Sequence, residues 1–403
     1  MMTDIRPAPT GRLLRDRSKP GHNRVHYLEL FFDLIFVFAV TQISHRLLKQ
    51  LTLGNALETF FLFVAMWWTW VYSTWVFNWL DPQRGRVRWM TFALALACLV
   101  MAVSIPDAFA GRGLVFAVTY VAAQLGRSLF TLYAMPQGSV LRDNFVRIAI
   151  WFAASAPFWI GGGFVDGAAR YALWGVALAI DVAGPVARFY VPSRGASEIS
   201  HWSIDGEHMA ERCALFIIIA LGESLMLTGA TFEKLEWTTP HWLTLLASVA
   251  ATLAMWWIYF DKGSERGAHH IAHSAQAGAL GRRIYTYFHA FIVAGVIVAA
   301  VGDELALAHP VGHLEPAALM VFGASSTLFL IGCALFKREI AGNFPLSHMV
   351  GLALTILALG AAWLLHWEPY QAAMIGAAAL VVTAVWETRS LATGLPEARR
   401  KPS

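Results

Sequence analysis

The amino-acid sequence predicts an all-α, polytopic integral membrane protein of about 12 transmembrane helices, arranged as two parallel six-helix repeats. Three observations lead to this prediction. Of the 403 residues, 57% are hydrophobic and only 14% are charged. The apolar runs reach the roughly 20 residues that cross a bilayer as a helix. Several motifs of the first half recur in the second half.

Residues 1–25 are polar and rich in arginine. No short apolar core with a small-residue cleavage site follows them, which argues against a cleaved signal peptide. We therefore predict a basic, disordered cytoplasmic tail that contacts anionic lipid. The net charge of +4 comes from loops and tails. Because no stacking platform accompanies the basic residues, we predict no nucleic-acid partner.

Apolar runs separated by turn residues define the expected helices. The breaks are Asp81-Pro82, Pro106-Asp107, Pro136-Gln137-Gly138, Gly161-Gly162-Gly163, Pro192-Ser193 and Glu368-Pro369. The expected spans are about 27–48, 56–80, 88–105, 112–134, 145–163, 167–189, 211–231, 241–260, 283–307, 314–336, 346–366 and 370–390. Trp and Tyr near the ends of these runs are typical of interfacial anchors.

The basic residues test this count of helices. With twelve spans, most of the 30 Lys and Arg residues fall on one side of the membrane. The positive-inside rule then places both termini in the cytoplasm. Arg127 is left inside a span.

The repeat is visible as three recurring motifs. His26-x-x-Glu29 recurs as His208-x-x-Glu211, Trp67-Trp68 recurs as Trp256-Trp257, and Asp107 recurs as Asp303. An even number of helices per half gives both halves the same orientation, related by an axis along the membrane normal. The expected regions are a tail at 1–25, repeats at 26–190 and 208–390, a cytoplasmic linker at 191–207, and a cytoplasmic tail at 391–403.

Two blocks also carry a family resemblance. Residues 26–39 read His-x-x-Glu-Leu-Phe-Phe-Asp-Leu-Ile-Phe-Val-Phe-Ala, and residues 211–224 run from Glu211-Arg212-Cys213 to Gly222-Glu223-Ser224. Both resemble the signature blocks of the bacterial low temperature requirement A family. The resemblance implies a multi-spanning protein of the bacterial cytoplasmic (inner) membrane, connected by name to growth in the cold.

Glu29 and Asp33 are the first candidate functional residues. They lie four residues apart on one face of a helix, so either one keeps a proton or a cation sits beside them. Arg212 and His208, at the corresponding entrance of the other half, are the natural partners. Three interpretations stay open: a proton or cation relay, a structural ion-pair cluster that also includes His26 and Glu211, or acids solvated at the membrane surface.

Glu223 lies some eleven residues into the seventh helix, at roughly mid-bilayer depth. An acid at that depth indicates a functional site, although a protonated Glu that bonds a neighbouring helix would explain it equally well. Gln42 reaches a similar depth in the first helix and could face it.

Arg127 and Asp181 lie at matching depths in the fourth and sixth helices, so we expect a charge pair between them. Asp107 and Asp303 end their helices at the external face, either as solvated acids or as a cation vestibule. A structural role for the charge pair is the simpler interpretation, because buried pairs often serve specificity.

The motifs of known enzyme sites are missing from the sequence. Cys98, Cys213 and Cys333 lie far apart without metal-ligand spacing. The sequence contains no phosphate-binding glycine loop, no Gly-x-Ser-x-Gly elbow and no His-Glu-x-x-His motif. We therefore predict no cofactor, no metal site and no enzymatic activity.

The leading functional hypothesis is a proton- or cation-coupled transporter, or a channel, for an unknown small solute or ion. The repeat and the acids in the first and seventh helices favour a site at the repeat interface, with Glu29, Asp33 and Glu223 as the protonatable groups. The alternative is a non-transporting membrane factor that acts on the lipid bilayer at low temperature. We also expect the first and seventh helices to face one another, with Arg212 in ion-pair reach of Glu29 or Asp33.

Overall fold

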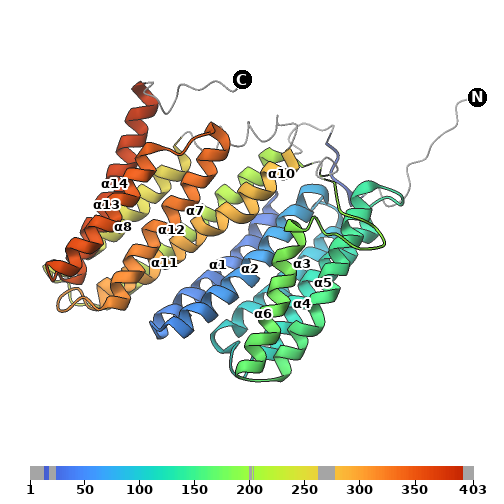
Figure 1. The fold of residues 1–403 in the computed structure, drawn as a ribbon, viewed down its shortest axis with the longest axis horizontal. Coiled ribbons are helices and arrows are strands. Elements are labelled where there is room, and N and C mark those ends of the chain that lie inside the picture. The colour runs from blue at the N-terminus through green and yellow to red at the C-terminus, as the bar shows by residue number, and fades with distance from the viewer. Residues whose placement is uncertain (1–12, 18–23, 199–201, 203, 262–276, 394–403) are drawn as a thin grey trace, which may run out of the picture. The chain divides into compact units, whose positions relative to one another are not determined.

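The computed structural model describes residues 13–17, 24–198, 202, 204–261 and 277–393. Among these residues every long element is a helix, and the β-type pairing consists of isolated bridges. The chain divides into two compact units (Figure 1). Unit 1 comprises residues 1–42, 64–211 and 274–279, and unit 2 comprises residues 43–63, 212–273 and 280–403. The boundary at 211/212 lies close to the expected linker, but residues 43–63 belong to unit 2.

Unit 1 is built from the first half of the chain. In Figure 1, α3 to α6 lie side by side, and each helix packs against the next. Its elements are most of α1 (Tyr27–Lys49) and α2 (Leu53–Trp79), α3 (Gly85–Ser104) with the 3-10 turn η2 (Ile105–Asp107), α4 (Gly113–Ala134), α5 (Val140–Phe164), α6 (Ala168–Val186) and the start of α7 (Gly206–Phe232).

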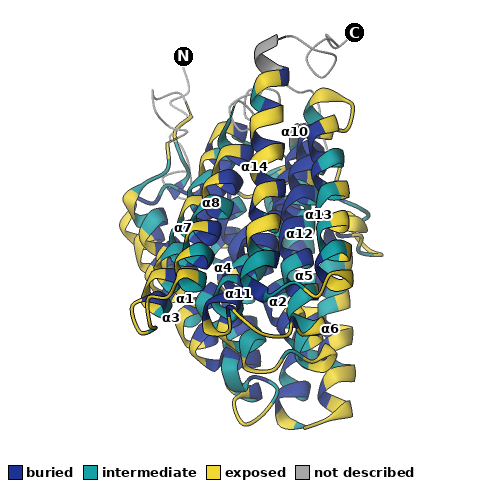
Figure 2. Cartoon of the chain, turned by 90° about the vertical axis from the view of Figure 1, so that its left-hand side faces the viewer, coloured by how far each residue is buried: buried dark blue, intermediate teal, exposed yellow. Residues whose placement is uncertain are grey.

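Unit 2 contains the rest of α7 and the helices that follow. Its elements are α8 (Thr239–Phe260), the end of α10 (Ala277–Gly281), the π-helical turn η4 (Arg282–Phe288), α11 (His289–Ala308), α12 (Pro316–Ala341), α13 (Leu346–Leu364) and α14 (Pro369–Thr393). The helices α11, α12, α13, α14 and α8 pack in that order, and α8 returns to α11. In Figure 2, α14 presents one exposed face and one buried face, as expected for a helix packed on one side.

Eleven of the described helices are long and apolar enough to cross a membrane by length and composition. The helix α6 is not among them, so the expected count of about 12 is met only in part. Arg170 and Asp181 lower the hydropathy of α6, but both are buried. Arg170 donates to the backbone oxygens of Ala110 and Val165 and pairs with Asp166.

The glycine run at 161–163 does not end α5, contrary to the expectation from the sequence. The helix continues to Phe164, and the turn at 165–167 with a positive φ at Gly167 makes the break. A β-carbon at Gly162 would lie 2.4 Å from the indole of Trp174, and one at Gly163 would lie 2.8 Å from the backbone of Leu114. These glycines therefore permit the close packing of α5 against α6 and α4.

The helices α11 and α12 approach each other in the same way. A β-carbon at Gly295 would lie 2.6 Å from the backbone nitrogen of Phe329, and one at Gly332 would lie 2.8 Å from that of Ile292. The two helices therefore touch backbone to backbone at two levels.

The described part of the N-terminal tail packs on unit 1 instead of being disordered. Leu13 is buried, and its backbone oxygen accepts a bond from the Asp81 amide. The Arg15 amide donates to the Trp79 oxygen. The sequence suggested disorder because the segment is polar. In the structure, donors of this segment bond carbonyl groups at the end of α2, where the helix itself supplies no partner.

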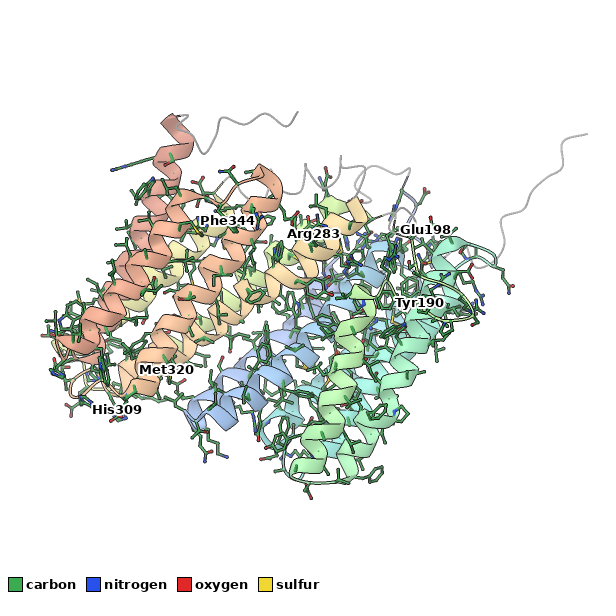
Figure 3. All side chains as sticks on the ribbon, in the orientation of Figure 1. Tyr190, Glu198, Arg283, His309, Met320 and Phe344 are labelled. Atoms are coloured by element: carbon green, nitrogen blue, oxygen red, sulfur yellow. The ribbon has the colours of Figure 1, made fainter. Side chains whose placement is uncertain are left out.

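Unit 2 also contains an apolar groove of about 330 Å³. It lies between the end of α1, the start of α2, and the helices α11 and α12. Its lining includes Leu47, Phe60, Ile297, Val298, Met320 and Leu328. Met320 is labelled near the start of α12 in Figure 3. One wall is fixed by the Asn55 amide, which donates to the backbone oxygens of Arg46 and Gln50.

Candidate functional site

Asp181 forms the centre of a buried polar network in unit 1. Its Oδ2 atom accepts hydrogen bonds from the Tyr120 hydroxyl at 2.8 Å and from the Trp159 indole at 2.9 Å. Trp68 donates to its backbone oxygen at 3.2 Å. The Oδ1 atom is buried and has no hydrogen-bond partner among the described residues. The Ser155 side chain lies beside the same carboxylate.

Arg127 is the second charge in this network and is 2% exposed. Its Nη1 atom donates to the backbone oxygen of Thr69 and to the Ser73 hydroxyl, each at 3.2 Å. Its Nη2 atom donates to the Gln124 side chain. The guanidinium lies 5.4 Å from the centroid of the Tyr72 ring, which adds a cation–π contact.

Arg127 and Asp181 do not form the direct charge pair that the sequence suggested. No ion pair joins them within the described structure, and a chain of polar side chains on α4 lies between them instead. Tyr120 bonds Asp181, Gln124 bonds Arg127, and Tyr120 and Gln124 lie one turn apart on α4. The prediction of a direct pair was wrong because matching depth does not fix the direction in which two side chains point.

Glu29 is fully buried and bonds side chains of the N-terminal tail and of α7 within unit 1. Arg15 of the tail forms an ion pair with its Oε1 atom, and His208 Nε2 lies 2.8 Å from its Oε2 atom. Asn78 donates to the other ring nitrogen of His208 at 3.2 Å. With Asn78 as the donor, Nδ1 is the acceptor, and Nε2 lies between the Glu29 carboxylate and Arg15 Nη2, which is 3.1 Å away.

The buried His208 side chain is surrounded by polar and charged groups. The Asn78 amide also donates to the Asp205 backbone oxygen at 2.9 Å, and the Asp205 carboxylate accepts from the His208 amide at 3.1 Å. Arg17 donates to the Asn78 oxygen. Burial lowers the pKa of Arg17, and the nearby Asp205 carboxylate opposes that shift.

Asp33 has its own partner one turn further along α1. Its Oδ1 atom accepts a 2.8 Å hydrogen bond from the Trp70 indole, and the residue is fully buried. Glu29 and Asp33 thus lie on one helix face, as the spacing predicts, and Asp33 adds an indole bond to the contacts of this face.

The remaining predicted residues differ in their burial and in the bonds near them. Glu223 and Gln42 are of intermediate exposure. The His26 amide donates to Glu29, and the Val25 amide donates to Glu211. Arg212 is fully buried. Its proposed pairing with Glu29 or Asp33 stays a prediction.

Sequence reasoning missed Arg15, Tyr120 and a second buried cluster, in unit 2. There the Lys337 ammonium forms an ion pair with Glu387 and donates to the backbone oxygen of Ile258 at 2.7 Å. The sequence suggested that the tenth span ends before Lys337, but α12 continues to Ala341. Lys337 and Glu387 each lie near the end of an apolar run, and this shared position could have indicated the pair.

The helices and the buried charges inside them define a multi-pass helical membrane protein. The chain matches the family model of the bacterial low temperature requirement A protein (LtrA) over residues 24–385 and belongs to this family. It is 41% identical, over 380 residues, to a protein of Rhizobium meliloti (strain 1021) that is described as uncharacterized. That match covers 92% of this chain and 90% of the relative. No solved structure matches the chain.

Proposed function

We propose that this protein moves a proton or a small cation across the bilayer, either coupled to a small solute or as a channel. The observation that carries the proposal is the buried Asp181 carboxylate, whose Oδ1 atom lacks a partner among the described residues. A charge in the membrane is expensive and usually marks an ion or substrate pathway. A purely structural carboxylate would be expected to bond through both oxygens.

Asp181 is the proton- or cation-binding group in this proposal. When ionised, it accepts hydrogen bonds from Tyr120 and Trp159. When Oδ1 takes up a proton, the new hydroxyl requires an acceptor, and the Ser155 side chain lies beside the carboxylate. Tyr120, which bonds Asp181, lies one turn from Gln124, which bonds Arg127, on the same helix.

We also propose that the two halves are structural repeats, which transporter folds commonly contain. Arg127 on the fourth helix donates to the oxygen of Thr69, and Lys337 on the tenth long helix donates to the oxygen of Ile258. Thr69 and Ile258 are the residues that follow the two Trp-Trp motifs. The order of packed helices also agrees, since α3-α4-α5-α6 in unit 1 corresponds to α11-α12-α13-α14 in unit 2.

The remaining parts of the proposal concern placement in the cell. We place the chain in the bacterial cytoplasmic membrane with α6 as a twelfth span and both termini in the cytoplasm. The excess of basic residues on that side supports this orientation.

Flux in proteoliposomes tests the proposal. Vesicles that contain a pH-sensitive dye are exposed to imposed H⁺, Na⁺ and K⁺ gradients, alone and with candidate amino acids, sugars and organic acids. We expect at least one gradient to dissipate faster with the protein, and Asp181→Asn to abolish the increase. Asp143→Asn, which changes an exposed acid of the same unit, should leave it intact. The absence of flux under every gradient would overturn the proposal.

A non-transporting membrane factor that supports growth in the cold is the second candidate. The family name, low temperature requirement, and exposed Trp side chains such as Trp89 and Trp237 favour it. In this case a deletion strain complemented with Glu223→Gln or Asp181→Asn would grow in the cold as well as one with the natural chain. A transporter would lose complementation with at least one of them.

A further inference from the structure

The apolar groove of unit 2 lies between helices that are long and apolar enough to span the membrane. Its floor consists of buried side chains, including Ile43 of α1, Phe63 of α2 and Ile297 of α11. Its rims are exposed, since Phe60 of α2 is 62% exposed and Met320 of α12 is 68% exposed. The groove is therefore open along its rims. Its volume of about 330 Å³ is in the range of ligand pockets, about 300–1,000 Å³.

The length of the groove corresponds to the depth of one leaflet of the bilayer. Its lining begins at Leu51 and Leu53, where α1 ends and α2 begins, and at Ala317 in the first turn of α12. Along α12 the lining continues to Leu328, a distance of about 16 Å at 1.5 Å per residue. The hydrocarbon layer of a bilayer is about 30 Å thick, so the groove covers roughly half of it. A chain that enters at the helix ends would contact the groove over one leaflet.

The lining is suited to hydrocarbon. Thr52 and Thr59 are its two polar residues among those that the structure describes. The Thr59 hydroxyl is buried and donates to the Asn55 backbone oxygen at 2.7 Å, so its hydrogen is already used. The Thr52 hydroxyl, where α2 begins, accepts from the Asn55 amide at 3.3 Å. No ionisable side chain belongs to the described lining. The occupant that matches these walls is an alkyl chain.

A cationic side chain lies at the end of the groove where the helices end. Lys49 is the last residue of α1, is exposed, and lies between the lining residues Leu47 and Leu51 in the chain. Arg46, one turn earlier, forms an ion pair with Glu58 of α2. No ion pair involves Lys49 in the part of the chain that the structure describes. Its charge at the membrane surface is complementary to the phosphate of a lipid headgroup.

We propose that this groove binds one acyl chain of a membrane phospholipid, with the headgroup phosphate beside Lys49. The bilayer supplies such chains at the depth that the groove covers. A helix of a second copy fits less well, because a helix about 10 Å across and 16 Å long occupies on the order of 1,000 Å³. The groove has about 330 Å³. Lipid binding at this site does not depend on the proposed ion movement.

Lipid retention and thermal stability test the site. The full chain is purified in dodecyl maltoside, and phosphatidylethanolamine with palmitoyl and oleoyl chains is added in increasing amounts. Native mass spectrometry counts the lipids that stay bound, and Tm reports the stabilisation. A ligand of the folded state gives a saturable rise in Tm. We expect this rise in the natural chain, together with one tightly retained lipid.

Filling the groove should remove this lipid. Ala324 of α12 belongs to the lining, so Ala324→Phe should abolish both the retained lipid and the saturable rise in Tm. Ala378→Phe is the matched control, because Ala378 is an exposed alanine of α14 outside the groove. This control should keep both signals.

Shortening a rim tests the same site without adding bulk. Met320→Ala should shift the lipid dependence of Tm to concentrations about fourfold higher or more, the factor for one lost methylene contact. This variant keeps the test valid where Ala324→Phe folds poorly. Met374→Ala on α14 removes another exposed methionine and should leave the lipid dependence unchanged.

The phosphate contact has its own variant. Lys49→Gln should weaken lipid binding by about two- to fivefold, the range for an exposed charge pair. Lys234→Gln, which changes another exposed lysine of unit 2, should have no effect. A Lys49→Gln variant with the lipid dependence of the natural chain would overturn the position given to the phosphate.

Three results would overturn the occupant itself. The first is equal lipid retention in the natural chain, Ala324→Phe and Met320→Ala. The second is an equally tight response to oleate, which would assign the groove to a free fatty acid. The third is a dimer that dissociates in Ala324→Phe without any change in lipid retention, which would assign the groove to a second copy. Flux measured on the same variants is a separate readout, so transport and lipid binding can fail independently.

Discussion

His208 Nε2 lies 2.8 Å from Glu29 Oε2, although 179 positions separate the two residues in the chain. This contact connects the start of α7 to the start of α1 within unit 1. Arg15 forms an ion pair with the other oxygen of the same carboxylate, Oε1. The N-terminal tail, α1 and α7 therefore meet at one buried acid, and the recurring His-x-x-Glu motifs contribute one residue each to this meeting point.

Removing Arg15 should destabilise unit 1 more than an ordinary surface change. Arg15→Gln leaves Glu29 buried with only part of its compensation, and breaking such a pair costs about 3–5 kcal/mol. We expect a clear fall in Tm in detergent. Arg15→Gln combined with Glu29→Gln should recover part of the loss, because no lone charge remains. Equal or greater loss in the double variant would contradict this account.

Gly162 and Gly175 form a matched pair for testing helix packing. Gly162→Ala should destabilise by about 1–3 kcal/mol, because its β-carbon would lie 2.4 Å from Trp174. Gly175→Ala on α6 meets open space and should be neutral or slightly stabilising, since alanine favours helix. Thermal unfolding of both variants checks the difference. A Gly162→Ala variant as stable as Gly175→Ala would show that α5 and α6 are packed less closely than described.

Lys337 and Glu387 should show the behaviour of a buried ion pair. Lys337→Met removes the ion-pair partner of the buried Glu387 carboxylate and should lower stability by about 3–5 kcal/mol. Lys337→Met with Glu387→Leu should be close to the natural chain, because apolar residues often replace such pairs at little cost. A double-mutant cycle measured by Tm gives the coupling between the two side chains. A coupling near zero would mean that the pair contributes nothing.

Trp159 should be needed to hold Asp181 in place. Trp159→Phe removes one of the two hydrogen bonds to Oδ2 and should cost about 1.5–3 kcal/mol, the range for a bond to a charged group. Tyr120→Phe removes the other bond, which comes from the residue one turn before Gln124 on α4. We therefore expect Tyr120→Phe to reduce flux more than Trp159→Phe at similar stability. The reverse order would place the proton path elsewhere.

The sequence predicted the helices well because apolar runs and Pro or Gly breaks act locally. The prediction failed where a contact depends on the direction in which a side chain points in the folded protein. Arg127 and Asp181 are at matching depths, but only the fold shows that Tyr120 and Gln124 stand between them. The polar tail looked disordered because no local signal reveals that Arg15 finds a buried carboxylate. The glycines of α5 looked like a break because local propensity cannot anticipate the indole of Trp174.

The contact of α11 with α12 through Gly295 and Gly332 has a mechanical consequence. Backbone touches backbone at two levels, so neither helix can slide or rotate alone without a collision. The two helices should therefore move together as one rigid pair. Asp303 lies near one end of this pair, and Lys337 lies near the other end, where it is bonded to Glu387 on α14. A displacement of α11 at Asp303 would therefore also displace α12 and the ion pair at its far end.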